Sequence, residues 1–430
     1  MNPKSNSNFI LLWVSQSVSQ FGSAMTGYAL IIWAYQQQKT AMTISLLSFF
    51  SFVPYVLVGI FAGGLVDRWK KKKTMLIADT VSECCTVAVF FLLHFGLLQV
   101  WHLYLINSVI GVMNAFQSPA SNVALGMLVP EGKYTKMSGM NTFSNSLTAI
   151  VTPMAATTIL SLFGLSYVLL VDVASFITAF VLLLLLIRIP EGKTNKPNVQ
   201  RSILSHSLEG MKFLFSNRGL FYLILCFAVM NLFSSMTYEN ILPAMILSRT
   251  NGSEQMLGAV SGTIGFGGVV GGLVVVVFPM PKNKVKVIFY SAGISFLFGD
   301  VLMGLGQNIF VWVIAAIAAS VPIAFVNGAQ TSLLYHTIPI EIQGRVFAVK
   351  NAFQYVAKPI GLLMGGFLAD TVFEPFMRSV SPQSTLASRL VGTGQGSGMA
   401  CMFLLTGILG GVFCLWLYQN RSVRSLENEN

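Results

Sequence analysis

Four ionisable side chains fall inside long apolar runs of the sequence: Glu83, Glu239, Asp300 and Lys358. A charge at the centre of a membrane helix costs about 2.5–3.5 kcal/mol on insertion scales, so such a residue usually has a partner, a water-filled cavity or a function. A carboxyl group in this setting can bind a proton or a cationic group, and a lysine can neutralise it. We therefore take these four residues as candidates for proton or charge coupling.

Glu239 and Lys358 each leave alternatives open. Glu239, within Thr237-Tyr238-Glu239-Asn240, is either a proton or cationic-substrate site in a cavity or a residue near the outer headgroups. Lys358 pairs with Glu239, acts as a charge released when a proton binds, or extends to the membrane surface. The nearest end of its run is roughly 12 residues away at 1.5 Å per residue, which is far for a lysine and favours the first two readings.

The apolar runs that carry these residues dominate the chain. It has 430 residues, of which 54% are hydrophobic and 10% are charged, and its mean hydropathy is +0.71. Soluble chains are nearer a quarter charged. A bilayer core needs roughly 20 apolar residues per helix, and backbone polar groups in lipid must be satisfied internally. The sequence therefore predicts an all-α polytopic membrane protein with twelve transmembrane helices, at about 9–34, 44–66, 74–97, 101–128, 137–162, 166–188, 219–247, 255–278, 284–306, 309–337, 345–370 and 398–418.

The basic residues indicate how the spans are oriented. The net charge is +11, but the bases lie in short links rather than on a nucleic-acid-binding surface. Odd-numbered links carry only Lys39, Arg249, Arg378 and Arg389. Apart from Lys358, which lies within a span, the other bases are in even-numbered links and both tails, namely Lys4, Arg68, Lys70 to Lys73, Lys133, Lys136, the bases from Arg188 to Arg218, Lys282, Lys284, Lys286, Arg345, Lys350, Arg421 and Arg424. Positive residues favour the cytoplasmic side, so we expect a multi-pass protein of the cell membrane with both termini in the cytoplasm.

Two sequence matches predict an internal repeat of six helices. Gly63-Gly64-Leu65-Val66 near the end of the second span is matched by Gly271-Gly272-Leu273-Val274 near the end of the eighth. Pro130, Asn141 and Phe143 are matched by Pro339, Asn351 and Phe353. We expect two pseudo-symmetric six-helix bundles, at 1–188 and 219–420, joined by a cytoplasmic linker at 189–218 with an amphipathic helix and followed by a cytoplasmic tail at 421–430.

The link after the second span carries a family resemblance. Gly64-x-x-Asp67-Arg68 followed by Lys71, Lys72 and Lys73 resembles the signature loop of the major facilitator superfamily, and the topology resembles it over essentially the whole chain. Pro130-Glu131 and the segment from Pro339 to Phe347 resemble the drug-exporter branch that includes macrolide efflux proteins.

The resemblance implies a cytoplasmic gate. Asp67 would face the positive N-terminal end of span eleven, which starts near Gly344 and Arg345, and the contact would hold the two halves together. Gly63 and Gly64 allow close helix approach, so with Asp67 and Arg68 they are gating candidates. The alternative, favoured for Lys70 to Lys73, is that these bases only set topology and touch anionic lipid.

The resemblance also places spans one, four, seven and ten around a central cavity, so Glu239 on span seven is the best coupling candidate. Glu83 and Asp300, on outer helices, are more often structural partners, and Asp172 lies near a span end where solvation is cheap. Polar residues at helical spacing on the four inner spans are candidates for the substrate cavity, with hydrogen bonding between helices as the competing explanation. The candidates are Gln16, Gln20, Asn107, Asn114, Gln117, Asn231, Ser235, Tyr238, Asn327 and Gln330.

The sequence departs from the proton-coupled drug antiporters at two places, and both leave the coupling ion open. Asn107 stands four residues before Gly111 where those proteins often have Arg, and Thr152-Pro153 lacks the flanking glycines of their fifth span. The histidines and cysteines are scattered in the sequence, so we expect no enzyme activity, metal or cofactor.

We predict a secondary active exporter of amphipathic small molecules, antibiotic or drug-like, working by proton-coupled antiport and alternating access. We expect it to act as a monomer, with protons and anionic lipid as further partners and no nucleic acid. Two alternatives remain open: an exporter of an endogenous metabolite, siderophore or lipid, and a membrane receptor or scaffold that transports nothing.

Overall fold

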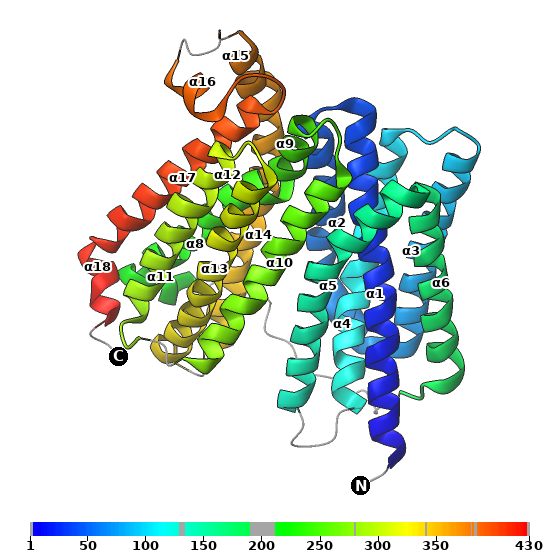
Figure 1. Ribbon diagram of the computed structural model, residues 1–430. Helices are drawn as coiled ribbons and strands as arrows, with labels where there is room; N and C mark the ends of the chain where they lie inside the picture. The colour runs from blue at the N-terminus through cyan, green and yellow to red at the C-terminus, as the bar shows by residue number, and fades with distance from the viewer. Residues whose placement is uncertain are drawn as a thin grey trace. The chain divides into compact units, whose positions relative to one another are not determined.

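The computed structural model describes residues 3–128, 134–189, 211–278, 281–339, 342–379, 381 and 385–427, and every regular element in these ranges is helical. Ten helical segments in these ranges are long and apolar enough to cross a membrane. This agrees with the predicted all-α membrane fold (Figure 1).

The described residues divide into two compact units, Met1–Lys39 with Thr43–Lys196, and Thr40–Met42 with Pro197–Asn430. The first unit contains the helices expected from spans one to six. They are α1 (Pro3–Gln38), α2 (Ala41–Arg68), α3 (Lys71–His94), α4 (Val100–Leu128), α5 (Tyr134–Phe163) and α6 (Leu165–Val181), which continues into the π-helical turn η1 (Leu182–Leu186).

The second unit repeats this pattern with more interruptions. Its helices are α8 (Arg218–Met236), η2 (Thr237–Ile241), α9 (Leu242–Arg249), α10 (Glu254–Val277), α11 (Lys284–Ile294), η3 (Ser295–Asp300), α12 (Val301–Leu305), α13 (Ile309–Thr337), α14 (Gln343–Leu368), η4 (Ala369–Phe373), α15 (Glu374–Ser379), α16 (Leu386–Val391), α17 (Ser397–Tyr418), α18 (Arg421–Arg424) and η5 (Ser425–Glu427). The turns η2, η3 and η4 are π-helical and continue straight into the next helix. Single π-helical turns of this kind often occur at functional sites.

α1 and α4 differ in composition from the ten strongly apolar segments. They have 36 and 29 residues and are long enough to span, but they are not among the ten. Both carry several Asn, Gln and Ser side chains, which lower their mean hydropathy. These are two of the helices on which the polar cavity residues were expected.

The eleventh predicted span is longer than its sequence pattern indicates. We expected an end near 370, but the helix runs through η4 and α15 to Ser379. Glu374 explains the ordered continuation, because its carboxylate accepts backbone hydrogen bonds from Gly396 (3.3 Å) and Met399 (3.1 Å) at the start of α17. An acidic group at a helix N-terminus is favourable. In the same unit α15 and α16 lie beside this end of α17, while α18 lies at its other end (Figure 1).

Two lysines in the link between α2 and α3 do more than set topology. Lys71 is buried, and its ammonium donates to the carbonyl oxygens of Val66 (2.7 Å) and Trp69 (3.1 Å). Lys72 donates to the carbonyl oxygens of Leu184 (3.0 Å) and Ile187 (2.9 Å). These carbonyls lie at the C-terminal ends of α2 and η1, where a helix leaves its acceptors unsatisfied and a positive charge is favourable. The two lysines therefore cap helix ends.

α2 packs closely against α4 in the first unit. The Phe50 and Tyr104 rings stack with centroids 5.5 Å apart. About two helical turns after Tyr104 on α4, a Cβ added at Gly111 would collide with the carbonyl oxygen of Ser51, the residue after Phe50. Gly111 is therefore required for the close approach of the two backbones.

We expect Gly111→Ala to lower the melting temperature of the purified protein, with a loss of about 1–3 kcal/mol in stability, because the methyl group meets backbone that cannot rotate away. Gly126→Ala on the same helix is the matched control, since a Cβ there meets nothing within 4 Å. Thermal unfolding followed by fluorescence-detected size exclusion compares the two variants. Equal melting temperatures would show that α2 and α4 are not in contact at Ser51.

Candidate functional site

An ion pair links two helices of the second unit. The Nζ of Lys358 on α14 lies 2.7 Å from Oε2 of Glu239 on η2, and the two side chains are 32% and 43% exposed. Of the alternatives for Lys358, the structure therefore shows the pair with Glu239. Both side chains of the pair remain partly accessible.

Two glycines bring α14 close enough for this contact. A Cβ at Gly361 would lie 2.5 Å from the carbonyl oxygen of Leu232, and one at Gly365 would lie 2.8 Å from that of Met236. Glycines four residues apart let membrane helices approach closely. Nearby, the side-chain amide of Asn240 donates to the carbonyl oxygen of Leu362 (2.7 Å) and fixes the register of the two helices.

The π-helical turn η2 directs neighbouring side chains to two different charged groups. Glu239 meets Lys358, whereas the hydroxyl of Tyr238 donates to Oδ1 of Asp300 at 2.7 Å. Asp300 is 1% exposed and ends a second π-helical turn, η3. The Tyr238 ring also packs edge-on against Phe403 of α17, with centroids 5.4 Å apart. Asp300 is thus a structural partner of Tyr238, as expected for an outer helix.

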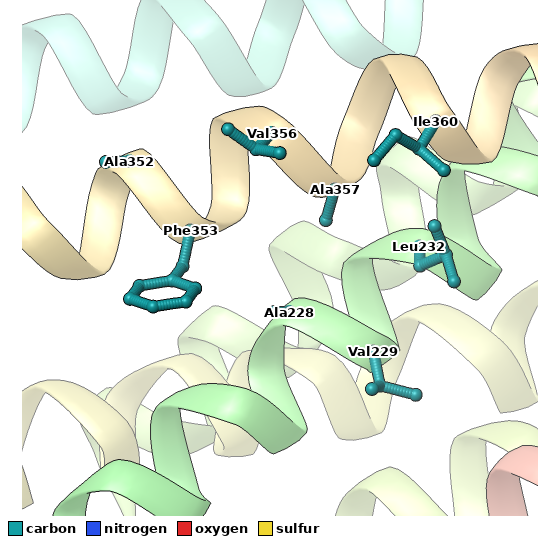
Figure 2. A pocket seen from close by; sticks show the side chains of 8 residues that line it. All are labelled: Ala228, Val229, Leu232, Ala352, Phe353, Val356, Ala357 and Ile360. Carbon is teal, nitrogen blue, oxygen red and sulfur yellow. The ribbon is translucent and has the colours of Figure 1, made fainter. Parts of the chain in front are cut away.

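An apolar groove of about 490 Å³ lies between α8 and α14 (Figure 2). α8 contributes Ala228, Val229 and Leu232, and α14 contributes Ala352, Phe353, Val356, Ala357 and Ile360. Phe353 and Ala357 point from α14 toward α8 in Figure 2. Ligand pockets commonly have volumes of about 300–1,000 Å³ and mostly apolar walls with a few polar groups. Lys358 directly follows Ala357 in the sequence, but neither Lys358 nor Glu239 is among the residues that line this groove.

The first unit contains a separate group of acids. Oδ1 of Asp172 on α6 accepts a hydrogen bond from the hydroxyl of Ser23 on α1 at 3.0 Å. Asp172 is 1% exposed and Glu83 on α3 is 6% exposed. Asp172 and Asp79 are the charged groups close enough to Glu83 to repel a negative charge on its carboxyl. The expectation that Asp172 lies near a solvated helix end is therefore wrong, because α6 packs closely against α1 at this position.

Asp79 was missed by the sequence reasoning, although it lies in the same apolar run as Glu83 and four residues before it. Residues four apart share one face of a helix, so this spacing could have revealed it. The side chains of Gln16 and Gln117 interact with Asp79. The amide of Gln117 also donates to Oε1 of Gln16 at 2.7 Å. Two of the predicted cavity residues are thus brought together, on α1 and α4.

The other predicted cavity residues are divided between surface and core. Gln20, Asn114 and Asn327 are exposed in their own units. Ser235 and Gln330 are 2% and 5% exposed, which favours packing between helices over contact with a substrate. The side-chain amide of Asn231 donates to the carbonyl oxygen of Phe227 on its own helix at 2.8 Å. The side-chain amide of Asn107 makes a long contact of 3.5 Å with the carbonyl oxygen of Leu47.

The gating candidates lie outside the side chains that the structure describes. Gly63, Gly64, Asp67 and Arg68 belong to the last turns of α2, and Gly344 and Arg345 belong to the first turn of α14. Their roles remain predictions.

We expect Glu239→Gln and Lys358→Met to lower the melting temperature singly, because each removes one member of the ion pair. The double variant should recover most of the loss. Both side chains are partly exposed, so the coupling energy should be on the order of 1 kcal/mol. Glu254→Gln combined with Lys358→Met is the control cycle and should show additive effects. Additive losses in the Glu239 and Lys358 cycle would mean that the two side chains do not interact.

Comparison with known proteins agrees with this architecture. The chain is 29% identical over 367 residues to Macrolide efflux protein A of Streptococcus pyogenes, which covers 85% of this chain and 90% of that protein. It is 29% identical over 326 residues to Macrolide efflux protein A of Enterococcus faecalis, covering 75% of this chain and 99% of that protein.

Solved structures show the same fold at low sequence identity. The nucleoside transporter NupG superposes with a TM-score of 0.72 at 12% identity, covering 98% of this chain and all (100%) of that one. A bacterial homologue of the iron transporter ferroportin, in an inward-facing state, gives 0.69 at 14% identity and covers 96% of this chain and 99% of that one. The sequence model of the Major Facilitator Superfamily matches residues 12–362. The chain therefore belongs to the Major Facilitator Superfamily and is a multi-pass membrane transporter.

Proposed function

We propose that this transporter exports amphipathic small molecules of the macrolide type by proton-coupled antiport and alternating access. The observation that carries the proposal is the ion pair between Glu239 and Lys358, the latter on α14, which also forms one wall of an apolar groove. Two relatives named Macrolide efflux protein A, at 29% identity and with good coverage, support the substrate class.

The pair offers a physical basis for exchange. When Glu239 is ionised, it attracts either Lys358 or the amino group of a cationic substrate whose apolar body occupies the groove. When Glu239 binds a proton, both attractions are lost and the substrate is released. One carboxyl thus binds proton and substrate alternately, which is the minimum requirement for antiport. Differential binding of each ligand to the two states then drives the conformational change.

The expected cytoplasmic gate is part of this proposal. Asp67 and Arg68 lie in the last turn of α2, and Gly344 lies in the first turn of α14. The N-terminal turn of a helix carries partial positive charge and attracts a carboxylate. We propose that Asp67 and the start of α14 form a latch that opens and closes during transport, with Gly63 and Gly64 permitting the close helix contact.

Transport is tested directly with proteoliposomes and a radiolabelled macrolide. We expect uptake that depends on an imposed pH gradient and collapses when a protonophore is added. Glu239→Gln should reduce gradient-driven uptake by at least about tenfold, because it removes the proton-binding group, the equivalent of about 1.4 kcal/mol or more. Glu254→Gln, at the first residue of α10, should keep wild-type uptake.

The results also separate the alternatives. Flux without any dependence on pH would remove proton antiport. Flux of a metabolite, siderophore or lipid but of no macrolide would remove the drug-export assignment. Absence of flux for every compound would favour a receptor or scaffold.

The proposed orientation, with both termini in the cytoplasm, rests on the distribution of basic residues. In a variant without native cysteines, we introduce Gln307→Cys between α12 and α13, or Ser425→Cys near the C-terminus; both positions are exposed. We expect a membrane-impermeant maleimide to label intact cells only at position 307, and both positions after permeabilisation. Labelling of Ser425→Cys in intact cells would reverse the orientation.

A further inference from the structure

Three carboxyl groups of the first unit lie together in a region without basic residues. Asp79 and Glu83 are on α3, and Asp172 is on α6. The sequence contains no lysine or arginine in residues 5–38, 74–128 or 137–187, which form α1, α4, α6, most of α3 and nearly all of α5. No lysine or arginine of these stretches is therefore available to neutralise the three carboxyls, in contrast to Glu239 with its partner Lys358.

One oxygen of the three carboxyls lacks a hydrogen-bond partner among the described residues, Oε1 of Glu83. Glu83 is 6% exposed and Thr26 is 5% exposed. Thr26 and Thr86 both interact with the carboxyl of Asp172, so Thr26 faces the acids from α1. Buried polar groups are nearly always hydrogen-bonded, so a buried carboxyl oxygen without a donor requires a physical explanation.

The charged groups around Glu83 indicate which ligand would neutralise its carboxyl. The titratable groups facing Glu83 are Asp79 on its own helix and Asp172 on α6. α1 and α4 contribute only the uncharged side chains of Gln16, Gln117, Ser23 and Thr26. Burying an isolated ionised carboxylate is very costly, and a second negative charge nearby adds to the cost. No group of three or more His, Cys, Asp or Glu residues in the described ranges is arranged to hold a metal ion. A proton is the ligand that removes the charge without a coordination shell.

The buried aspartates of both units have hydrogen-bond donors, whereas Oε1 of Glu83 has none among the described side chains. Asp300, on the third membrane segment of that unit, accepts a hydrogen bond from Tyr238 on its first segment. In the first unit, Asp172 likewise accepts from Ser23. Glu83 has no such donor to its buried Oε1 among the described side chains. Asp79 lies one helical turn away, is half-buried, and contacts Gln16 and Gln117, so it can pass a proton between Glu83 and water.

We propose that Glu83 is a proton-binding site of the first unit, with Asp79 as its connection to solvent, separate from the Glu239–Lys358 pair. At neutral pH the Glu83 carboxyl holds one proton, which moves to Asp79 and then to water when the site opens. The use of this proton in transport rests on the proposed function. The binding of the proton to Glu83 does not, because it requires no substrate.

Infrared spectroscopy tests proton binding without a transport assay. The purified full-length protein in lipid is titrated from neutral to alkaline pH, and the C=O stretching band of protonated carboxyl groups is recorded. We expect Glu83→Gln to remove from the neutral-pH spectrum the intensity of one carboxyl group. Glu83→Asp should retain a band at a shifted frequency, which controls for misfolding. Glu239→Gln, in the second unit, should leave the Glu83 contribution unchanged.

The outcomes are distinct from those of the transport assay. An unchanged band in Glu83→Gln would overturn the site, even if transport proves proton-coupled. If transport shows no pH dependence while the band is lost in Glu83→Gln, the antiport proposal fails and the proton site stands. Disappearance of the band when sodium replaces potassium at neutral pH would identify a cation site and would also overturn the proposal.

Discussion

The cost of an unneutralised charge inside the membrane constrains this protein more than any other interaction. The second unit meets the constraint by pairing Glu239 with Lys358 at 2.7 Å. The pair requires α8 and α14 to approach closely, which Gly361 and Gly365 allow. Because both side chains are partly exposed, the pair contributes modestly to stability, and each charge depends on the other for part of its neutralisation.

The two units solve the problem of buried acids in related but different ways. Each buries an aspartate where helices from the beginning and the later part of the unit meet, Asp172 beside Ser23 and Asp300 beside Tyr238. Only the first unit adds Asp79 and Glu83, without a nearby base. The second unit instead has Glu239 paired with Lys358. The apolar groove between α8 and α14 also belongs to the second unit.

At the ends of helices, basic and acidic side chains stabilise the structure by hydrogen bonding to backbone groups. Lys71 and Lys72 satisfy carbonyl oxygens at the ends of α2 and η1, and Glu374 satisfies amides at the start of α17. Lys71 and Glu374 are buried, so these hydrogen bonds to the backbone, rather than water, satisfy their charged groups. Their effect is to fix where each helix stops, and so the length of the segment within the membrane.

The sequence by itself was sufficient for the helical membrane fold and for the family, because both depend on local patterns: apolar runs long enough to span a bilayer, and the motif around Asp67. It also identified Glu239 and Lys358 as a possible pair, because charges in apolar runs are few. It could not show that Glu83 and Asp172 lie together, that Asp172 is buried, or that Lys72 caps η1. Those contacts join residues far apart in the chain. Such burial and proximity arise only when helices pack. The sequence pattern of a helix indicates which of its faces is polar, but it does not indicate which face of another helix packs against it.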